Sequence, residues 1–313
     1  MIRKAPYAAA TPERGFVLVA VLWIIAALSA LATIFAVYLS NSAQALAVSD
    51  TGLQAEAVVS ASVELTTYQL SLVGEGARPF QGSFRYRLGD ADISVSFVSE
   101  AARIDLNLAP KETLANLFSG LGAAQEDAAQ YADRILGWRT SPKADAADDE
   151  LSLYRAAGLS YSPRQAPFAH VNELALVVGL PPALVDRALP FVTVFSGQPK
   201  VNALVAPPEV IASLPGMTPS GLKEFLRARP TLPRDAAAIA TALGPAQAGA
   251  TIDKSDFFRI LTTVKFDNGR QTSSEVVIEL RGEDEPYRVL SWRDEVETTT
   301  GRSRKLVGDG DDL

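Results

Sequence analysis

The sequence predicts an α+β protein in which a long N-terminal helix packs on an antiparallel sheet, with a large all-α segment inserted between two β-hairpins. Three observations lead to this fold class. An apolar segment continues into a helical pattern over residues 16–75. Period-two alternation is confined to residues 78–103 and 251–297. The residues between these two regions, 104–250, are rich in Ala, Leu and Pro at helical spacing.

A short basic leader, residues 1–15, precedes an apolar segment. The leader contains Arg3, Lys4 and Arg14, whereas the 24 residues from position 16 to 39 carry no charge. A helix of that length spans roughly 36 Å, enough to cross the hydrocarbon core of a bilayer. Because basic residues precede the span and none follows it closely, the positive-inside rule places the N-terminus in the cytoplasm.

Beyond residue 39 the pattern becomes that of an amphipathic helix ending near Gly74 and Gly76. Apolar residues follow one another at steps of three, four or seven, which is one face of a helix. We expect this stripe to cover the sheet and to be buried. Its members are Leu46, Leu53, Ala57, Ala61, Leu65, Tyr68 and Leu72.

Two hairpins and a final strand make up the predicted sheet. In the first hairpin, alternating residues flank the turn Gly89-Asp90, and in the second, β-branched runs flank Asp267-Asn268-Gly269. The helical block separates the hairpins, so it is an insertion rather than an appended domain. The tail, 298–313, is polar and predicted to be disordered. The expected strands are 84–88, 93–97, 260–266, 275–280 and 287–292.

The insertion contains a weak internal repeat. Residues 103–110 and 200–207 both begin with a basic and an apolar residue, end in Ala-Pro, and are followed by an acid, Glu112 or Glu209. Residues 171–189 form a third helix–turn–helix outline. Such segments are similar to helix-hairpin-helix units, which in other proteins hold DNA phosphates at a glycine turn, and the expected fold of the insertion is helix-hairpin-helix or SAM-like. Packing alone is the favoured interpretation, because the turn Leu-Pro-Gly-Met before Thr218 has a single glycine.

Composition excludes several functions. The formal charge is −7, which becomes −9 once the leader is removed, so binding to a phosphate backbone is unfavourable. The chain has no cysteine and one histidine, His170, which rules out disulfides, thiolate zinc sites and multi-histidine metal sites. We expect His170 to be a helix cap, Trp138 and Trp292 to fill cores, and Trp23 to lie in the span. Without a nucleophile elbow or a phosphate loop, we predict no enzymatic activity and no catalytic residue.

The pair Gly15-Phe16 ahead of a long apolar helix resembles a type IV prepilin N-terminus. Together with the hairpins, the helical insertion and the Ala-Pro segments, it resembles the K-type minor pseudopilin of bacterial type II secretion (general secretion pathway protein K). The resemblance covers the chain except the tail. It implies a type IV pilin-like fold, cleavage by prepilin peptidase between Gly15 and Phe16, and methylation of the new Phe16 amine.

One departure from the general pilin pattern fits the K type. Most pilins carry a glutamate as the fifth residue of the mature chain, and here that residue is Ala20. A carboxylate in hydrocarbon costs at least about 3 kcal/mol unless it is paired. A subunit at the filament tip lacks the neighbour that would supply the pairing amine, so Ala20 suits a capping position. A plain membrane anchor, in which no acid is expected, is the alternative.

An acidic stretch contains Asp145, Asp148, Asp149 and Glu150. It corresponds to a region where K-type proteins carry an acidic, calcium-holding stretch, and closely spaced oxygen ligands suit calcium. The match is imperfect because residues 137–140 stand where the family has further acids. A solvated charge run is the favoured interpretation and calcium the alternative. No other cofactor is expected.

The resemblance implies a single-pass inner-membrane protein with its C-terminal head in the periplasm, at the tip of the type II secretion pseudopilus. There it would prime filament assembly for export across the outer membrane. The implied partners are the I- and J-type minor pseudopilins, the major pseudopilin, prepilin peptidase and the inner-membrane secretion platform. Two alternatives remain open: a membrane-anchored DNA-uptake protein that uses its helical repeats, and an anchored periplasmic binding protein with an uncleaved N-terminus.

Overall fold

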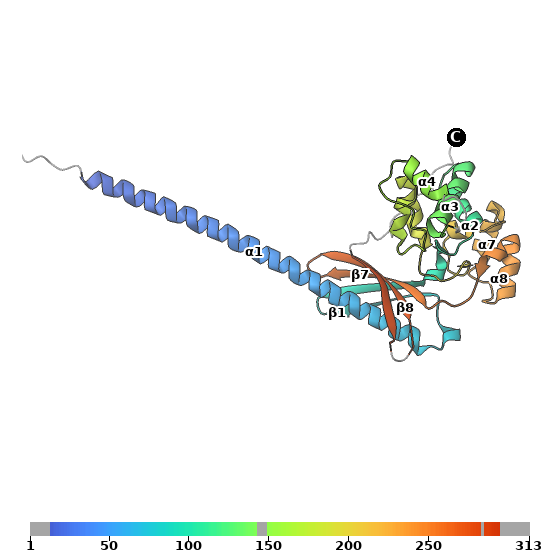
Figure 1. Cartoon of the computed structure of the whole chain (residues 1–313). Coiled ribbons are helices and arrows are strands. Elements are labelled where there is room, and N and C mark those ends of the chain that lie inside the picture. Colours follow the sequence, from blue (N-terminus) through green and yellow to red (C-terminus); the bar gives the residue numbers. More distant parts are fainter. Residues whose placement is uncertain (1–12, 143–148, 283–284, 295–313) are drawn as a thin grey trace, which may run out of the picture. The chain divides into compact units, whose positions relative to one another are not determined.

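The computed structural model describes residues 13–142, 149–282 and 285–294, and for residues 13–17, 41–51, 75 and 149 the backbone alone. The chain divides between Val58 and Val59 into two compact units. Helix α1 (Glu13–Leu72) runs through the boundary as one 60-residue element, confirming that span and amphipathic segment are continuous (Figure 1). Residues 1–12 of the predicted leader and the tail 298–313 lie outside the described residues.

A five-stranded sheet in the second unit has the order β1-β2-β7-β8-β9, with every neighbouring pair antiparallel. Gly89 and Gly269 adopt φ of 60° and 84° at the two hairpin turns, a backbone region that glycine enters without a Cβ clash. Both predicted hairpins and the final strand are confirmed. The strands are β1 (Gln81–Leu88), β2 (Ala91–Ser99), β7 (Phe257–Phe266), β8 (Gln271–Leu280) and β9 (Tyr287–Arg293).

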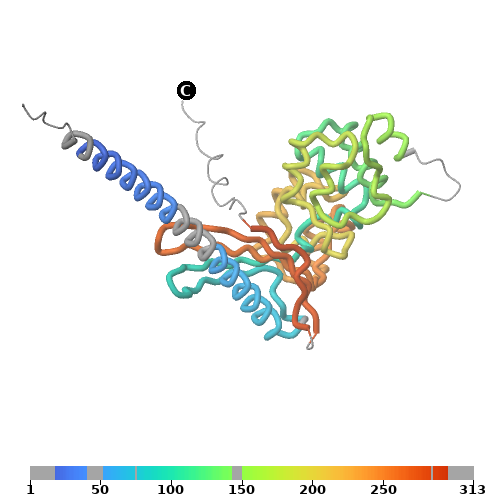
Figure 2. Tube along the Cα trace, turned by 60° about the vertical axis from the view of Figure 1, so that its left-hand side comes forward, coloured from blue at the N-terminus to red at the C-terminus, as the bar shows by residue number. Residues whose placement is uncertain are grey.

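Alternate residues of the central strands form the sheet's buried face, where residues 59–72 of α1 pass (Figure 2). Tyr287 Oη donates a hydrogen bond of 2.8 Å to Glu64 Oε1, and Ser62 Oγ lies 2.8 Å from Tyr86 Oη. Helix and sheet are thus joined by polar contacts at two positions. The buried apolar residues include Val59, Val63 and Leu70 of the helix and Ile93, Val95, Phe97, Ile260 and Val264 of the sheet.

The expected buried stripe of α1 is wrong. Leu53, Leu65, Tyr68 and Leu72 are 39–65% exposed, and Ala57 is exposed as well. Apart from Leu70, the buried face instead consists of β-branched and hydroxyl residues, small enough for the helix to approach the sheet closely. Thr66 satisfies its hydroxyl locally by donating to the carbonyl of residue 62 at 2.7 Å. Apolar spacing alone favoured the larger leucines and missed this face, which comprises Val58, Val59, Ser62, Val63, Thr66, Thr67 and Leu70.

The segment between β2 and β7 is largely helical and has its own apolar core, which includes Trp138 and Phe118. Its first short elements are η2 (Glu100–Ala102), β3 (Ile104–Asp105), α2 (Lys111–Gly120), α3 (Gln125–Arg139), α4 (Asp149–Ala156), η3 (Val171–Leu176), α5 (Pro182–Ala188), η4 (Leu189–Phe191) and β4 (Val192–Thr193). Those that follow are β5 (Val201–Asn202), α6 (Pro208–Ala212), α7 (Pro219–Ala228), α8 (Ala236–Leu243), η5 (Gly244–Gly249) and β6 (Ala250–Thr251); η1 (Glu75–Ala77) precedes β1.

The weak sequence repeat is a structural repeat. Strand β3 pairs in parallel with β4, and β5 pairs in parallel with β6. The side chains of Asp105 and Asn202 each accept the backbone N–H two residues on, at 2.8 and 3.0 Å. In each copy one arginine at the end of a later helix, Arg139 in α3 or Arg229 directly after α7, donates to two carbonyls of the Ala-Pro segment. In the third outline, residues 171–176 form a 3-10 helix rather than an α-helix.

Two leucines in the same helix provide a matched test of the corrected face. Leu70 is fully buried and Leu72 is 65% exposed. We expect Leu70→Ala to lower the free energy of unfolding by about 2–5 kcal/mol, because it removes buried methyl groups and leaves a cavity. Leu72→Ala should change it by less than about 0.5 kcal/mol. Urea unfolding of the detergent-solubilised chain measures both, and equal losses would contradict the assignment of the face.

Candidate functional site

The apolar part of α1 is the first functional element. Residues 18–40 are long and apolar enough to cross a membrane, and none of this window is buried within the protein. Among the described residues it is the one helix that meets this condition. Trp23 lies in it and is 73% exposed. An uninterrupted apolar surface of this size needs a nonaqueous environment. Ala20 lies on the same segment, whereas for Gly15 and Phe16 only the helical backbone is described.

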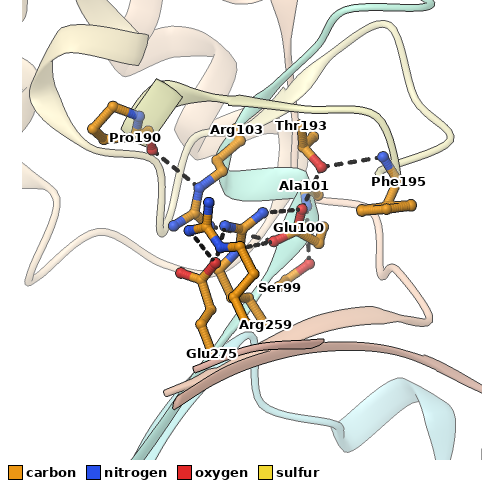
Figure 3. Close-up of polar contacts among 10 residues, drawn as sticks. Ser99, Glu100, Ala101, Arg103, Pro190, Thr193, Phe195, Arg259 and Glu275 are labelled. Carbon is orange, nitrogen blue, oxygen red and sulfur yellow. Dashed lines mark hydrogen bonds and ion pairs between the residues drawn. The ribbon is translucent and has the colours of Figure 1, made fainter. Parts of the chain in front are cut away.

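The second element is a buried ionic cluster where the sheet meets the insertion (Figure 3). Glu100, with no exposed side-chain surface, lies in η2 directly after β2, and the Ser99 hydroxyl caps this turn by accepting the Ala101 N–H at 3.3 Å. Arg259 of β7 points to the same place, because its strand neighbours at 258 and 260 point into the core. Its Nε and Nη2 donate to the two oxygens of Glu100 at 2.7 and 3.0 Å, a bidentate pair.

Further polar groups complete the cluster. From the insertion, the Thr193 hydroxyl donates to Glu100 Oε2, and Arg103 donates to the Pro190 carbonyl at 3.0 Å. From the sheet, Glu275 Oε1 accepts hydrogen bonds from Arg259 and from Arg293, each at 2.8 Å. We call this set the ionic junction. Its members are Glu100, Arg103, Thr193, Arg259, Glu275 and Arg293.

Opposing forces set the protonation of the junction. Burial alone raises the pKa of Glu100, but the charge and hydrogen bonds of Arg259, with help from Arg103 and Thr193, hold that pKa below its ordinary value. Burial lowers the pKa of Arg259, and the charges of Glu100 and Glu275 reverse this to a raised pKa. Arg103 differs, because burial and repulsion by Arg259 lower its pKa to about 10. The central pair is therefore ionised at neutral pH.

Sequence reasoning did not find the junction. Arg259 and Glu100 are 159 positions apart, so nothing local relates them. One signal was present: an arginine stands in the middle of the otherwise apolar run Phe257–Leu261, on the face opposite the core. A charged side chain in such a strand requires a partner once an insertion covers it. The signal indicates that a partner exists but does not identify it.

The predicted acidic site falls mostly outside the described part of the chain. Asp145 and Asp148 lie there, and Asp149 begins α4 with only its backbone described. Glu150 is not solvated as a charge run would be: its side chain is 13% exposed, and Oε2 accepts from Arg134 at 2.7 Å. Its Oε1 is buried without a hydrogen-bond partner. Within the described residues no group of three or more possible ligands occurs, so calcium stays a prediction.

Other expectations are resolved individually. His170 is confirmed as a cap, its Nδ1 accepting the Asn172 N–H at 3.1 Å before η3. Trp138 is buried, but Trp292 is only half-buried because it lies on the edge strand β9. In the turn suggested for DNA, the Thr218 hydroxyl accepts the Gly221 N–H at 3.1 Å. The Gly221 N–H, one of the amides that would have to donate to a DNA phosphate, is therefore already hydrogen-bonded within the protein.

The exposed apolar helix and the α+β head with its helical insertion define a protein consistent with a single-pass membrane anchor. Residues 96–197 match the family model described as type II secretion system (T2SS), protein K, so the resemblance drawn from the sequence is confirmed. A chain of the crystal structure of the GspK-GspI-GspJ complex from enterotoxigenic Escherichia coli is similar in fold, with a TM-score of 0.60 and 16% identity over 78% of this chain and 96% of that chain. No curated protein matches the sequence.

Breaking the junction should destabilise the head. Glu100→Gln leaves Arg259 buried with a neutral partner, and we expect the free energy of unfolding at pH 7 to fall by about 3–5 kcal/mol. Because the folded pKa of Glu100 is lowered, its stabilisation is complete above the ordinary value of 4.5 and is lost as pH falls through the folded value. The difference between wild type and variant should thus shrink below pH 4.5.

Asp267→Asn is the matched control. Asp267 pairs with Arg87 at 2.7 Å, but both side chains are more than half exposed. A surface pair of this kind contributes less than about 1 kcal/mol. Urea unfolding at pH 7 and pH 3 measures both variants, and a Glu100→Gln effect no larger than the control would refute the junction's structural role.

Proposed function

We propose that this protein is a minor pseudopilin at the tip of the type II secretion pseudopilus, where it primes filament assembly for protein export across the outer membrane. The observation that carries this proposal is the protein K match over residues 96–197. That segment runs from β2 through the ionic junction residues 100, 103 and 193 into the insertion. The fold likeness to a chain of the GspK-GspI-GspJ complex supports it further.

The exposed apolar helix supports a location in the inner membrane with the head in the periplasm. In this proposal prepilin peptidase cleaves between Gly15 and Phe16, and the new Phe16 amine is methylated. The mature chain then consists of a helix (16–75), two parts of a pilin sheet (78–103 and 251–297) and the inserted α-domain (104–250).

The finer fold assignment also belongs to the proposal. Helix α1 on an antiparallel sheet would be a type IV pilin-like fold, and the paired Ala-Pro segments would be helix-hairpin-helix or SAM-like units. An insertion between two central strands adds volume on the head, which a filament accommodates where no subunit stacks above. Ala20 supports the same position, because an acid there would have no neighbouring amine to pair with.

The outer face of α1 supports assembly with other subunits. Beyond the span, Leu53, Leu65, Tyr68 and Leu72 are exposed, and burying them on a partner helix would be favourable at about 25 cal/mol per Å². The proposed partners are the I- and J-type minor pseudopilins, followed by the major pseudopilin and the inner-membrane platform. Calcium at residues 145–150 remains the accompanying metal prediction, with the free Oε1 of Glu150 as one available ligand oxygen.

Processing gives the first test. Intact mass spectrometry of the protein purified from membranes should show a chain that begins at Phe16 and carries one methyl group on its amine. Substitution of Gly15 with a bulky residue should prevent cleavage, because the peptidase would recognise the small residue before the span. A mature protein that retains Met1 would contradict the pilin assignment and favour a simple anchored protein.

Assembly gives the second test. Leu65 is 39% exposed, and Leu65→Glu should reduce copurification with the I- and J-type proteins about tenfold, because a charge would be buried at the contact. Ser71→Glu is the control, since Ser71 is exposed on the same helix but lies about 120° around it from Leu65, and the change adds the same charge. Equal effects would contradict the contact. Crosslinking that finds subunits stacked above this protein would contradict the tip position.

A further inference from the structure

A basic hollow lies where the start of β1 faces the second half of the insertion. Its volume is about 390 Å³, and its lining includes Phe80 and Gln81 on one side and Arg229 and Arg234 on the other. Within the described part of the chain, no carboxylate is among the residues that line it. This is unexpected in a chain of net charge −7, and it indicates a site suited to an anionic group.

Two more cationic residues, Lys254 and Arg78, lie next to the residues that line the hollow. Lys254 lies 4.3 Å from the centre of the Phe80 ring and donates to the Arg78 carbonyl. Burial lowers the pKa of Lys254, and the charges of Arg78 and Arg234 lower it further. The Lys254 ammonium over the Phe80 ring is therefore repelled by Arg78 and Arg234, and a nearby anion would reduce that repulsion.

Two acids close to the hollow already have partners. Asp256 pairs with Arg78 at 2.6 Å, and the Asp235 carboxylate caps α8 by accepting the Ala238 N–H at 2.9 Å. Arg78 Nε is buried without a hydrogen-bond partner. Arg234 is exposed and makes no ion pair with another described residue. Arg229 and Arg234 thus line the hollow without an ion pair to a described carboxylate.

We propose that the acidic segment of residues 308–313 of the same chain binds in this basic hollow. The segment carries Asp309, Asp311 and Asp312, with Gly310 between the first two, and the chain has no basic residue after Lys305. These three carboxylates are opposite in charge to Arg229 and Arg234, the two arginines that line the hollow.

The segment can reach the hollow. The register across the sheet runs from Arg293 through Glu275, Leu261 and Ser96 to Ser83, which lies three residues beyond Phe80 on β1. Four strand spacings and three residues along a strand correspond to roughly 20–30 Å. From Asp294 to position 310 the chain has 16 residue steps, which extend up to about 53 Å. Tethering also gives the segment a millimolar effective concentration.

Because the chain has no cysteine, engineered pairs report the contact directly. The full detergent-solubilised chain carrying Gln81→Cys and Gly310→Cys should form an intramolecular disulfide under mild oxidation. Its rate should exceed that of the pair Gln271→Cys and Gly310→Cys at least about fivefold, through the higher local concentration. By strand register Gln271 is four residues from the partner of Arg293, so it is nearer to Asp294 than the hollow is.

Charge variants complete the experiment. Arg234→Glu in the Gln81 pair should slow disulfide formation at least about threefold, and raised salt should do the same, because attraction between exposed charges is screened. Arg227→Glu is the control, since Arg227 is exposed on α7 outside the lining. Equal rates for the Gln81 and Gln271 pairs, or no effect of Arg234→Glu, would overturn the proposal. A disulfide between two chains would also overturn it and identify a second copy as the occupant.

Discussion

The bidentate pair between Arg259 and Glu100 is the contact on which the head depends. Glu100 directly follows the second strand and begins η2, so whatever fixes this residue fixes the point where the helical block departs from the sheet. Arg259 lies on the returning strand and holds both carboxylate oxygens. Thr193 and Arg103 then connect the same carboxylate to the middle of the insertion. A fully buried charge is tolerated here only because it accepts hydrogen bonds from three side chains at once.

The sequence predicted the positions of the helices and strands better than it predicted which side of helix α1 is buried. Alternation and the Asn268-Gly269 turn were sufficient for the strands, because both signals are local. The buried face of α1 was missed, since large apolar residues such as Leu65 are exposed while the smaller Val63 packs on the sheet. The pairing of Arg259 with Glu100 joins distant positions, so spacing could not reveal it. The acidic stretch at 145–148 lies outside the described residues, and the sequence stays the only guide there.

Two kinds of surface are combined in α1. Its short β-branched and hydroxyl residues face the sheet together with Leu70, whereas Leu53, Leu65, Leu72 and Tyr68 are exposed. A helix designed only to cover a sheet would have the opposite arrangement. In the proposed assembly the outward leucines meet a neighbouring subunit. The repeated Ala-Pro segments of the insertion are instead stabilised internally, each by one arginine, Arg139 or Arg229, that spans two carbonyls.

The place where the insertion leaves the sheet has a consequence for how such a head could arise. Ser99 and Phe258 are direct partners across the two central strands, so the ends of the inserted block are already neighbours without it. Closing a long loop between adjoining ends costs only slowly more entropy as the loop grows. An ancestral plain hairpin could therefore have acquired a folded module at this corner while every ladder bond stayed in register. The sequence and structure of the inserted helical block would then diverge independently of the sheet into which it is inserted.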